Sequence, residues 1–253
     1  MAFTIAVSGK GGTGKTSLAA LIVRHLVKHV RRAVLAVDAD PNSTLAQALG
    51  VEVTCTVADI REDAVAKRLD VPEGASRERH IEYCIQQSIL ECHGFDLLTM
   101  GRPEGPGCYC YVNHLLRGCL DVASGDYPFV VIDNEAGMEH LSRRTTTNVD
   151  VLFIVAEPTV ISAESALRVA DAARKLPIRI LRPRMVINKV SDGGLHPNVI
   201  AKFRSAGLRV DYQLPYDPAL VDVWATGTPV MGLPDDSPSV LRVAQMIACE
   251  MSE

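Results

Sequence analysis

Short apolar runs alternate along the chain with longer stretches in which apolar residues recur every three or four positions. The short runs predict strands, and several are apolar at consecutive positions, as strands covered on both faces require. They are FTIAVS (3–8), AVLAVD (33–38), FDLLTM (95–100), FVVIDN (129–134), VLFIVAE (151–157), RMVINK (184–189) and LRVDYQLP (208–215). The longer stretches predict helices, such as Thr16–Val30, Leu141–Thr147, Ser162–Lys175 and Pro238–Met251.

This alternation predicts an α/β fold, with a doubly wound, mainly parallel sheet flanked by helices. Residues 51–94 depart from it, because they are rich in Glu, Arg, His and Gln and contain no run suited to a buried strand. We interpret them as a helical insertion within a single domain that spans residues 1–253. The C-terminal stretch is amphipathic but acidic, so we expect it to pack on the core and not to bind lipid.

Composition narrows the possible partners. The net charge is −4, which argues against nucleic-acid binding through Lys and Arg. No stretch approaches the roughly 20 apolar residues of a membrane span, and the N-terminus lacks the features of a signal peptide. We therefore expect a cytoplasmic protein without membrane insertion, in which the seven cysteines are reduced thiols.

The segment GKGGTGKT fits the P-loop pattern G-x-x-x-x-G-K-[ST], and it follows a predicted strand and opens a predicted helix. Backbone N–H groups of such a loop cradle phosphates, and the helix N-terminus favours the same anion. Lys15 would reach the β- and γ-phosphates, and the Thr16 hydroxyl would bind Mg²⁺. The nucleotide-binding residues expected here are Gly9, Lys10, Gly11, Gly12, Thr13, Gly14, Lys15, Thr16 and Ser17.

The early lysine of this loop, Lys10, is not part of the ordinary P-loop pattern. GKGG-x-GK[ST] resembles the deviant P-loop of the MinD/ParA/nitrogenase-iron-protein class of ATPases. The resemblance implies a MinD-like P-loop fold and a homodimer that closes on ATP. It also implies that Lys10 reaches the partner subunit's nucleotide, as an arginine finger supplied in trans does.

Further parts of that class find counterparts at the ends of predicted strands. Strand AVLAVD ends in Asp38, followed by Asp40, and the resemblance implies that Asp38 positions the attacking water and that Asp40 acts near Mg²⁺ or in a switch movement. Asp133 and Gly137 have the D-x-x-x-G spacing of a switch II. Asp133 is expected to hold Mg²⁺ through water, and Gly137 to donate its N–H to the γ-phosphate.

The choice of base is indicated by Asn188 and Lys189 at the end of another predicted strand. The guanine-reading motif is N-K-x-D, but its fourth position here is Ser191, so no carboxylate is available for guanine and we expect adenine. LPYD at 214–217 resembles the adenine-side loop of the same class, which implies that Pro215 packs near the base. The expected cofactors are thus ATP or ADP and Mg²⁺.

The segment GPGCYC places two thiols, Cys108 and Cys110, one residue apart. In an extended segment such residues point to the same face and offer two thiolates, half of a tetrahedral site. A two-fold axis through a homodimer would bring a second pair and complete a Cys₄ site, whose thiolates suit Zn²⁺, Ni²⁺ or Cu⁺; Ni²⁺ or Zn²⁺ is the expected metal. The other five cysteines are expected to be structural.

Together, the deviant P-loop, GPGCYC and VIDNEAGMEHLSRRT resemble the CooC-type ATPases that mature nickel carbon monoxide dehydrogenase. The resemblance implies an ATP hydrolase that delivers nickel to apo carbon monoxide dehydrogenase or to the related acetyl-CoA synthase. Two alternatives stay open. One is an electron-transfer ATPase with an iron–sulfur cluster, although no cysteine follows Asp133 as the nitrogenase iron protein requires. The other is a positioning ATPase of the MinD/ParA type.

Overall fold

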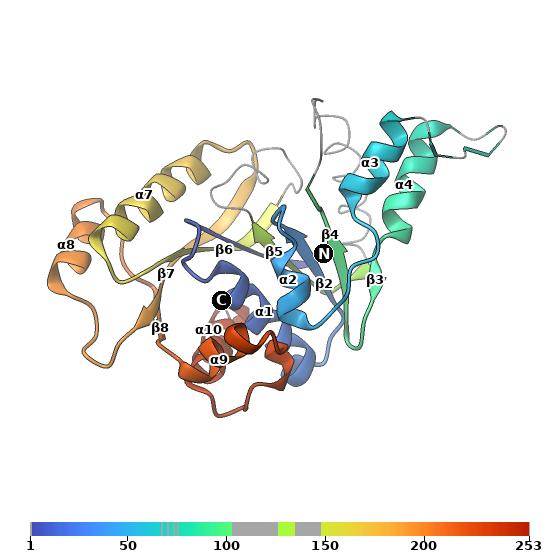
Figure 1. Ribbon diagram of the computed structural model, residues 1–253. Coiled ribbons are helices and arrows are strands. Elements are labelled where there is room, and N and C mark those ends of the chain that lie inside the picture. Colours follow the sequence, from blue (N-terminus) through green and yellow to red (C-terminus); the bar gives the residue numbers. More distant parts are fainter. Residues whose placement is uncertain are drawn as a thin grey trace.

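We describe the protein from a computed structural model, which covers residues 2–66, 68–69, 71–72, 74, 76–102, 126–134 and 148–252. Its strands form one eight-stranded sheet in the order β3-β4-β2-β5-β1-β6-β7-β8, in which every neighbouring pair is parallel except β3 and β4 (Figure 1). The strands are β1 (Phe3–Gly9), β2 (Val34–Ala39), β3 (Leu90–Glu91), β4 (Phe95–Thr99), β5 (Phe129–Asn134), β6 (Asn148–Ala156), β7 (Arg179–Val190) and β8 (Tyr212–Pro215). The predicted mainly parallel α/β sheet is confirmed.

Helices cover both faces of the sheet (Figure 1). The described helices are α1 (Lys15–His25), its π-helical continuation η1 (Leu26–Val30), α2 (Thr44–Leu49), α3 (Val57–Val65), α4 (Arg77–Gln87), α7 (Val160–Lys175), α8 (Pro197–Ser205), α9 (Pro218–Thr226), the 3₁₀ turn η2 (Val230–Gly232) and α10 (Pro238–Ser252). Helices α1, α2 and α10 pack on one face, and α3, α4, α7 and α8 on the other.

The central strands are apolar at consecutive positions because successive side chains enter different cores. In β2, Val34 and Ala36 belong to the core under α1, whereas Leu35 and Val37 belong to the core under α7. All four are at most 2% exposed.

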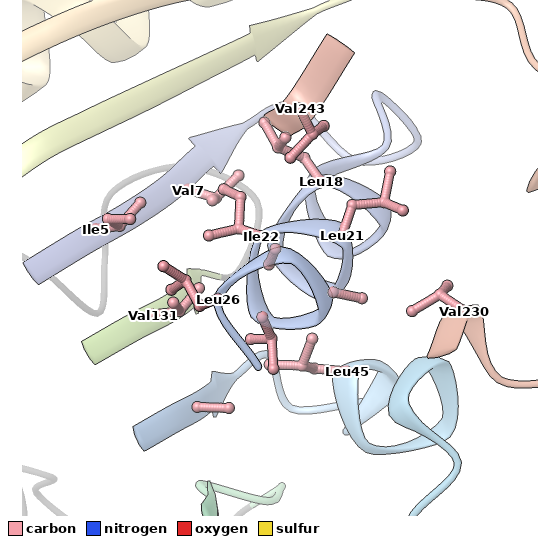
Figure 2. Close-up of a cluster of buried hydrophobic side chains, with 14 of the residues drawn as sticks. Ile5, Val7, Leu18, Leu21, Ile22, Leu26, Leu45, Val131, Val230 and Val243 are labelled. Carbon is pink, nitrogen blue, oxygen red and sulfur yellow. The ribbon is translucent and has the colours of Figure 1, made fainter. Parts of the chain in front are cut away.

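The helix that follows the P-loop is held firmly on the sheet (Figure 2). Leu18 and Ile22 of α1 lie in one buried cluster with Ile5 and Val7 of β1. Burying a side chain of this size stabilises the fold by about 1.5–3 kcal/mol. The P-loop between β1 and α1 is therefore anchored at both ends by the core.

Among the described residues of 51–94, the structure has helices α3 and α4 and the two-residue strand β3, which was not expected. Thr56 and Asp59 form a capping box that starts α3. Ile60 of α3 and Ile81 and Ile85 of α4 are buried in the same core as α7. The helical pair thus extends one face of the sheet.

Several short elements were missing from the prediction, namely α2, α8 and α9. Helices α8 and α9 each begin with proline at the first helical position, after a capping residue, His196 or Asp217. A proline in this position is a recognisable start signal that was overlooked. Strand β7 also begins earlier than expected, at Arg179, because its first half alternates between exposed and half-buried residues. The predicted helix Leu141–Thr147 lies outside the described residues.

The C-terminal helix α10 packs on the core, as expected from its sequence. Val243 and Ile247 are fully buried, and the helix contacts α1. Glu250 is also buried and accepts hydrogen bonds from Arg184 and Tyr212, which ties the helix to β7 and β8. Within the described part of the chain, no helix has the length and apolarity needed to cross a bilayer.

Candidate nucleotide-binding site

The P-loop lies at the carboxyl ends of the central strands. Strand β1 runs between β5 on one side and β6 on the other. From β1 the chain moves toward the β3 edge of the sheet to form β2. From β5 it moves toward the opposite edge, the β8 edge, to form β6. The strand order therefore changes direction at β1. Ligands of open α/β sheets bind in the crevice at such a point.

Two glycines of the loop are required by close packing. A Cβ on Gly9, whose φ is +152°, would overlap the carbonyl oxygen of Val155 in β6. A Cβ on Gly14, whose φ is +90°, would overlap the side-chain amide nitrogen of Asn188. Residues with side chains rarely adopt these backbone conformations, so both positions need glycine for two independent reasons.

The start of α1 has the features of an anion-binding helix end. Its N-cap is Gly14, which makes no side-chain cap, and its first turn contains no acidic residue. The first N–H groups of a helix have no partner within the helix and carry the positive end of its dipole. Lys15, at the first position of the helix, is only 7% exposed and adds a positive charge. This combination suits bound phosphate.

Polar side chains from β7 hold the P-loop in place. The Asn188 side-chain amide donates to the Thr13 carbonyl oxygen at 2.9 Å, and its own oxygen accepts from the Lys189 N–H at 2.9 Å. Lys189 has a left-handed backbone, with φ of 59°. Its ammonium donates to the Gly12 carbonyl oxygen at 2.9 Å and to Glu157 at 2.7 Å. The two residues predicted to bind nucleotide thus position the loop itself.

The carboxylate of Asp133, at the end of β5, is buried beside Lys15 and Thr16. It is 0% exposed, and neither of its oxygens has a hydrogen-bond partner of good geometry among the described residues. Burial raises the pKa of Asp133 to about 7, and the charge of Asp38 adds to this effect. The Thr16 hydroxyl and the Lys15 charge act in the opposite direction. Such a carboxylate, beside a hydroxyl, is suited to a hard cation such as Mg²⁺.

Asp38 is the cross-strand neighbour of Asp133 in the β2–β5 register and is also 0% exposed. Its carboxylate accepts the N–H groups of Leu45 at 2.8 Å and Ala46 at 3.3 Å, in the first turn of α2, and that of Asp40 at 3.2 Å. Burial nevertheless raises the pKa of Asp38 to about 6. In this structure Asp38 therefore holds the start of α2.

Asp40 lies in the turn between β2 and α2, and Thr44 is the first residue of α2. The Asp40 carboxylate accepts from the Asn42 backbone N–H at 2.9 Å and from the Asn42 side-chain amide at 2.8 Å, which stabilises the turn locally. The Thr44 hydroxyl lies 3.3 Å from the Thr16 hydroxyl. Thr44 was not among the predicted site residues, although a hydroxyl shortly after the Asp38–Asp40 pair is a signal that could have identified it.

The predicted base-side residues converge from neighbouring strands. Pro215 of β8 is paired with Val190 of β7, two residues after Asn188, and it is half-buried. The Tyr216 N–H donates to the Val190 carbonyl oxygen at 2.8 Å. The side-chain nitrogen and the side-chain oxygen of Asn188 each have one protein partner, and each can form a second hydrogen bond.

Lys10 is exposed, and its ammonium makes no hydrogen bond or ion pair with any described residue. Its carbonyl oxygen accepts from the Thr13 hydroxyl at 2.8 Å, so the loop backbone is ordered while the side chain is available. Ser17 follows in the first turn of α1 and is half-buried.

The predicted thiol pair, Cys108 and Cys110, lies outside the described residues, as does Gly137. Among the residues that the structure does describe, no group of three or more His, Cys, Asp or Glu side chains is arranged to hold a metal ion. Cys55, Cys84 and Cys92 are half-buried free thiols and Cys249 is an exposed one.

Two other site residues were missed from the sequence. Glu157, at the end of the predicted strand VLFIVAE, pairs with Lys189 across the P-loop. Asn134 is 1% exposed and donates from its amide to the Val7 carbonyl oxygen at 2.9 Å, which ties β5 to β1 just before the P-loop. Their positions at strand ends were visible, but their contacts depend on strand order.

Comparisons with known proteins agree with this geometry. The sequence profile described as the CobQ/CobB/MinD/ParA nucleotide binding domain matches residues 4–230. An uncharacterized ATP-binding protein of Methanocaldococcus jannaschii is 40% identical over 245 residues, which cover 96% of each chain. The carbon monoxide dehydrogenase accessory protein CooC of Rhodospirillum rubrum is 34% identical over 188 residues, 70% of this chain and 71% of that protein.

Among solved structures, the cell division ATPase MinD of Pyrococcus furiosus superposes with a TM-score of 0.70. The match covers 100% of this chain and 99% of MinD at 22% identity, so it establishes a shared fold. Together with the family match over most of the chain, these findings show that the protein belongs to the CobQ/CobB/MinD/ParA nucleotide-binding family, the MinD/ParA type of P-loop ATPase.

Proposed function

We propose that this protein is a dimeric, Mg²⁺-dependent ATPase metallochaperone that inserts nickel into apo carbon monoxide dehydrogenase or the related acetyl-CoA synthase. The observation that carries the ATPase part is the buried carboxylate of Asp133 beside the P-loop, which has no hydrogen-bond partner of good geometry among the described residues. The similarity to CooC and the C-x-C pair in the sequence support the nickel-delivering part.

The described residues fit a magnesium nucleotide. Thr16 and Asp133 would hold Mg²⁺, with Thr44 beside them. When bound, Mg²⁺ supplies positive charge that neutralises the β- and γ-phosphate oxygens. Lys15 and the start of α1 would bind the same phosphates, and Asn188 and Pro215 would lie beside an adenine.

Hydrolysis requires that Asp38 change partners. In the structure its oxygens accept backbone N–H groups of α2, so Asp38 can orient an attacking water only if some of these hydrogen bonds are released. Release would free the start of α2 and couple hydrolysis to movement. Lys10 would contribute from the opposing subunit, where its exposed ammonium can reach the nucleotide.

Nickel is the cargo of the proposed cycle. Cys108 and Cys110 of two subunits would together offer four thiolates, a set that accepts Ni²⁺ or Zn²⁺. Closing and opening of the dimer would then assemble and separate the two halves of the site. ATP binding would thereby control when the metal is held.

Metal stoichiometry of the dimer tests this proposal. The wild-type protein should bind one Ni²⁺ or Zn²⁺ per dimer, and the Cys108→Ala/Cys110→Ala variant should bind none. Cys55→Ala/Cys84→Ala is the matched control, because it removes two half-buried thiols and should leave metal binding intact. Unchanged metal affinity in the first variant would refute the proposed site.

The alternative of a MinD/ParA-type positioning ATPase is favoured by one observation, the match to MinD over the whole chain. In such a protein ATP would control attachment to a lipid or DNA surface, and the thiols would play no part. Sedimentation with anionic vesicles or with DNA, in the presence and absence of ATP, separates the two functions. ATP-dependent sedimentation without metal binding would favour the alternative.

A further inference from the structure

The chain has one tryptophan, Trp224, and it contacts the P-loop helix. Its indole N–H donates to the Ser17 hydroxyl at 2.8 Å, across 207 residues of sequence. Yet Trp224 remains 40% exposed, and its helix α9 has no fully buried residue. A large aromatic side chain is thus held at the P-loop while part of its surface stays open.

The inner side of α9 explains how Trp224 is positioned. Ala219, Leu220 and Val223 are partly buried and pack against the core cluster that contains α1 and α10. Trp224 follows Val223 directly and lies one helical turn after Leu220, so it stands at the edge of this contact. Figure 1 shows α9 on the same side of the sheet as α1 and α10.

The position of Ser17 locates the indole relative to a bound nucleotide. Lys15 and Thr16 are placed for the β- and γ-phosphates, and the loop also cradles the α-phosphate. Ser17 is the next residue of the helix, so a ribose and base that continue from the α-phosphate must pass close to this turn. Helix α9 begins at Pro218, three residues after Pro215, at the edge of the sheet where the base is expected.

We propose that Trp224 forms an aromatic wall of the site, against which the base or ribose of the nucleotide packs. This inference rests on the proposed nucleotide binding and adds a specific contact to it. The hydrogen bond from the indole N–H to the Ser17 hydroxyl would hold the ring beside the phosphate cradle, whether or not a phosphate is bound. The exposed part of the ring would then lie against the nucleoside.

The proposal makes the nucleoside part of the ligand responsible for the contact. Base–aromatic stacking tolerates any base, because every base has a π-face, so Trp224 would add affinity without choosing adenine. Choice of base would remain with Asn188. Inorganic tripolyphosphate, which has neither ribose nor base, should fill the phosphate cradle without touching the ring.

Because Trp224 is the only tryptophan, its fluorescence reports on this site alone. We expect Mg²⁺–ADP to change the emission of the wild-type protein at saturation, and Mg²⁺–tripolyphosphate to leave it nearly unchanged. Calorimetry gives the binding constants of both ligands independently. ADP binding that is visible by calorimetry but leaves the emission unaltered would overturn the inference and leave the proposed function standing.

Three variants sharpen the test. Trp224→Ala should weaken ADP binding by roughly tenfold and tripolyphosphate binding by less than about twofold. Trp224→Phe keeps a ring and should bind ADP almost as tightly as the wild type. Val221→Ala is the matched control, because Val221 is an exposed apolar residue one turn earlier on α9.

The outcomes are distinct. Equal loss in Trp224→Phe and Trp224→Ala would show that the Ser17 hydrogen bond matters and that the ring does not, which contradicts the proposal. Equal loss of ADP and tripolyphosphate in Trp224→Ala would indicate a general disturbance of the loop and would also contradict it. Failure of the wild-type protein to bind ADP by calorimetry would refute the proposed function itself.

Discussion

At the scale of single residues, the buried carboxylates of Asp38 and Asp133 lower the stability of the folded protein when both are charged. They are opposite each other on adjacent strands, both are fully buried, and burial raises both pKa values. Asp38 offsets part of the cost by accepting backbone N–H groups, whereas Asp133 has no such partner among the described residues. A bound cation would remove this cost, so we expect cation binding and stability to be coupled.

Replacing Asp133 by Asn should stabilise the nucleotide-free protein at high pH. The pKa of Asp133 is raised from 3.8 to about 7, so the folded state binds the proton more tightly than the unfolded state. The resulting stability is fully present below about pH 4 and is lost as pH rises through about 7. Asp133→Asn should therefore raise the free energy of unfolding by about 4 kcal/mol at pH 8, by less than half of that at pH 5 and by little at pH 4, measured by urea denaturation.

The same variant should lose the stabilisation that Mg²⁺–ADP gives the wild-type protein, an effect of about 2.7 kcal/mol at a hundredfold excess over Kd. Asp192→Asn, which removes an exposed carboxylate, serves as the control and should change neither property. A destabilised Asp133→Asn protein at pH 8 would contradict this account of the buried charge.

At the scale of elements, the packing of the C-terminal helix α10 decides whether its apolar face contacts the core or is open to other surfaces. Helix α10 presents an apolar stripe, which in isolation suits either a lipid surface or a protein core. In the structure that stripe is buried against α1 and the sheet, and Glu250 is held by Arg184 and Tyr212. The helix is therefore part of the core and is not available as a separate anchor.

Substitutions on the two sides of α10 should separate these roles. Ile247→Ala, at a position that is 0% exposed, should lower the free energy of unfolding by about 2–4 kcal/mol because it leaves a cavity. Leu241→Ala, on the same helix but 51% exposed, should change it by less than about 0.5 kcal/mol. Thermal unfolding measures both, and similar effects of the two changes would show that α10 does not pack as described.

At the scale of the whole molecule, the exposed Lys10 makes a specific prediction about assembly. If Lys10 acts on the partner's nucleotide, Lys10→Ala should lower the hydrolysis rate by about a thousandfold or more while ADP affinity stays unchanged. Asp38→Asn should also be inactive. Phosphate release by the separate and mixed variants measures the effect.

Mixing the two inactive variants is the decisive arm. In a mixed dimer, the nucleotide of the Lys10→Ala subunit meets both its own Asp38 and the partner's intact lysine. An equal mixture should therefore recover about a quarter of the wild-type rate, because half of the dimers are mixed and each has one complete site. No recovery, with dimers confirmed by sedimentation, would mean that Lys10 acts within its own subunit.

The sequence predicted those features whose structural requirement fixes the residue types within a short segment, namely the buried strands and the P-loop. Consecutive apolar runs identified the buried strands, because a strand covered on both faces must be apolar at every position. The P-loop was recognisable because its glycines are required locally, as the overlaps at Gly9 and Gly14 show. Helix α2 was missed because it is short and its first turn is held by the Asp38 carboxylate, which lies outside the helix.

The sequence by itself thus determined the α/β class, the P-loop with its extra lysine and the aspartates at the strand ends, since these depend on residue type and local order. Only the tertiary structure decided which of those residues meet. Strand order placed Asp38 beside Asp133, Lys189 across the P-loop to Glu157, and Trp224 against Ser17. These contacts join residues far apart in the chain, so they follow from how the sheet and its helices pack and not from any local pattern.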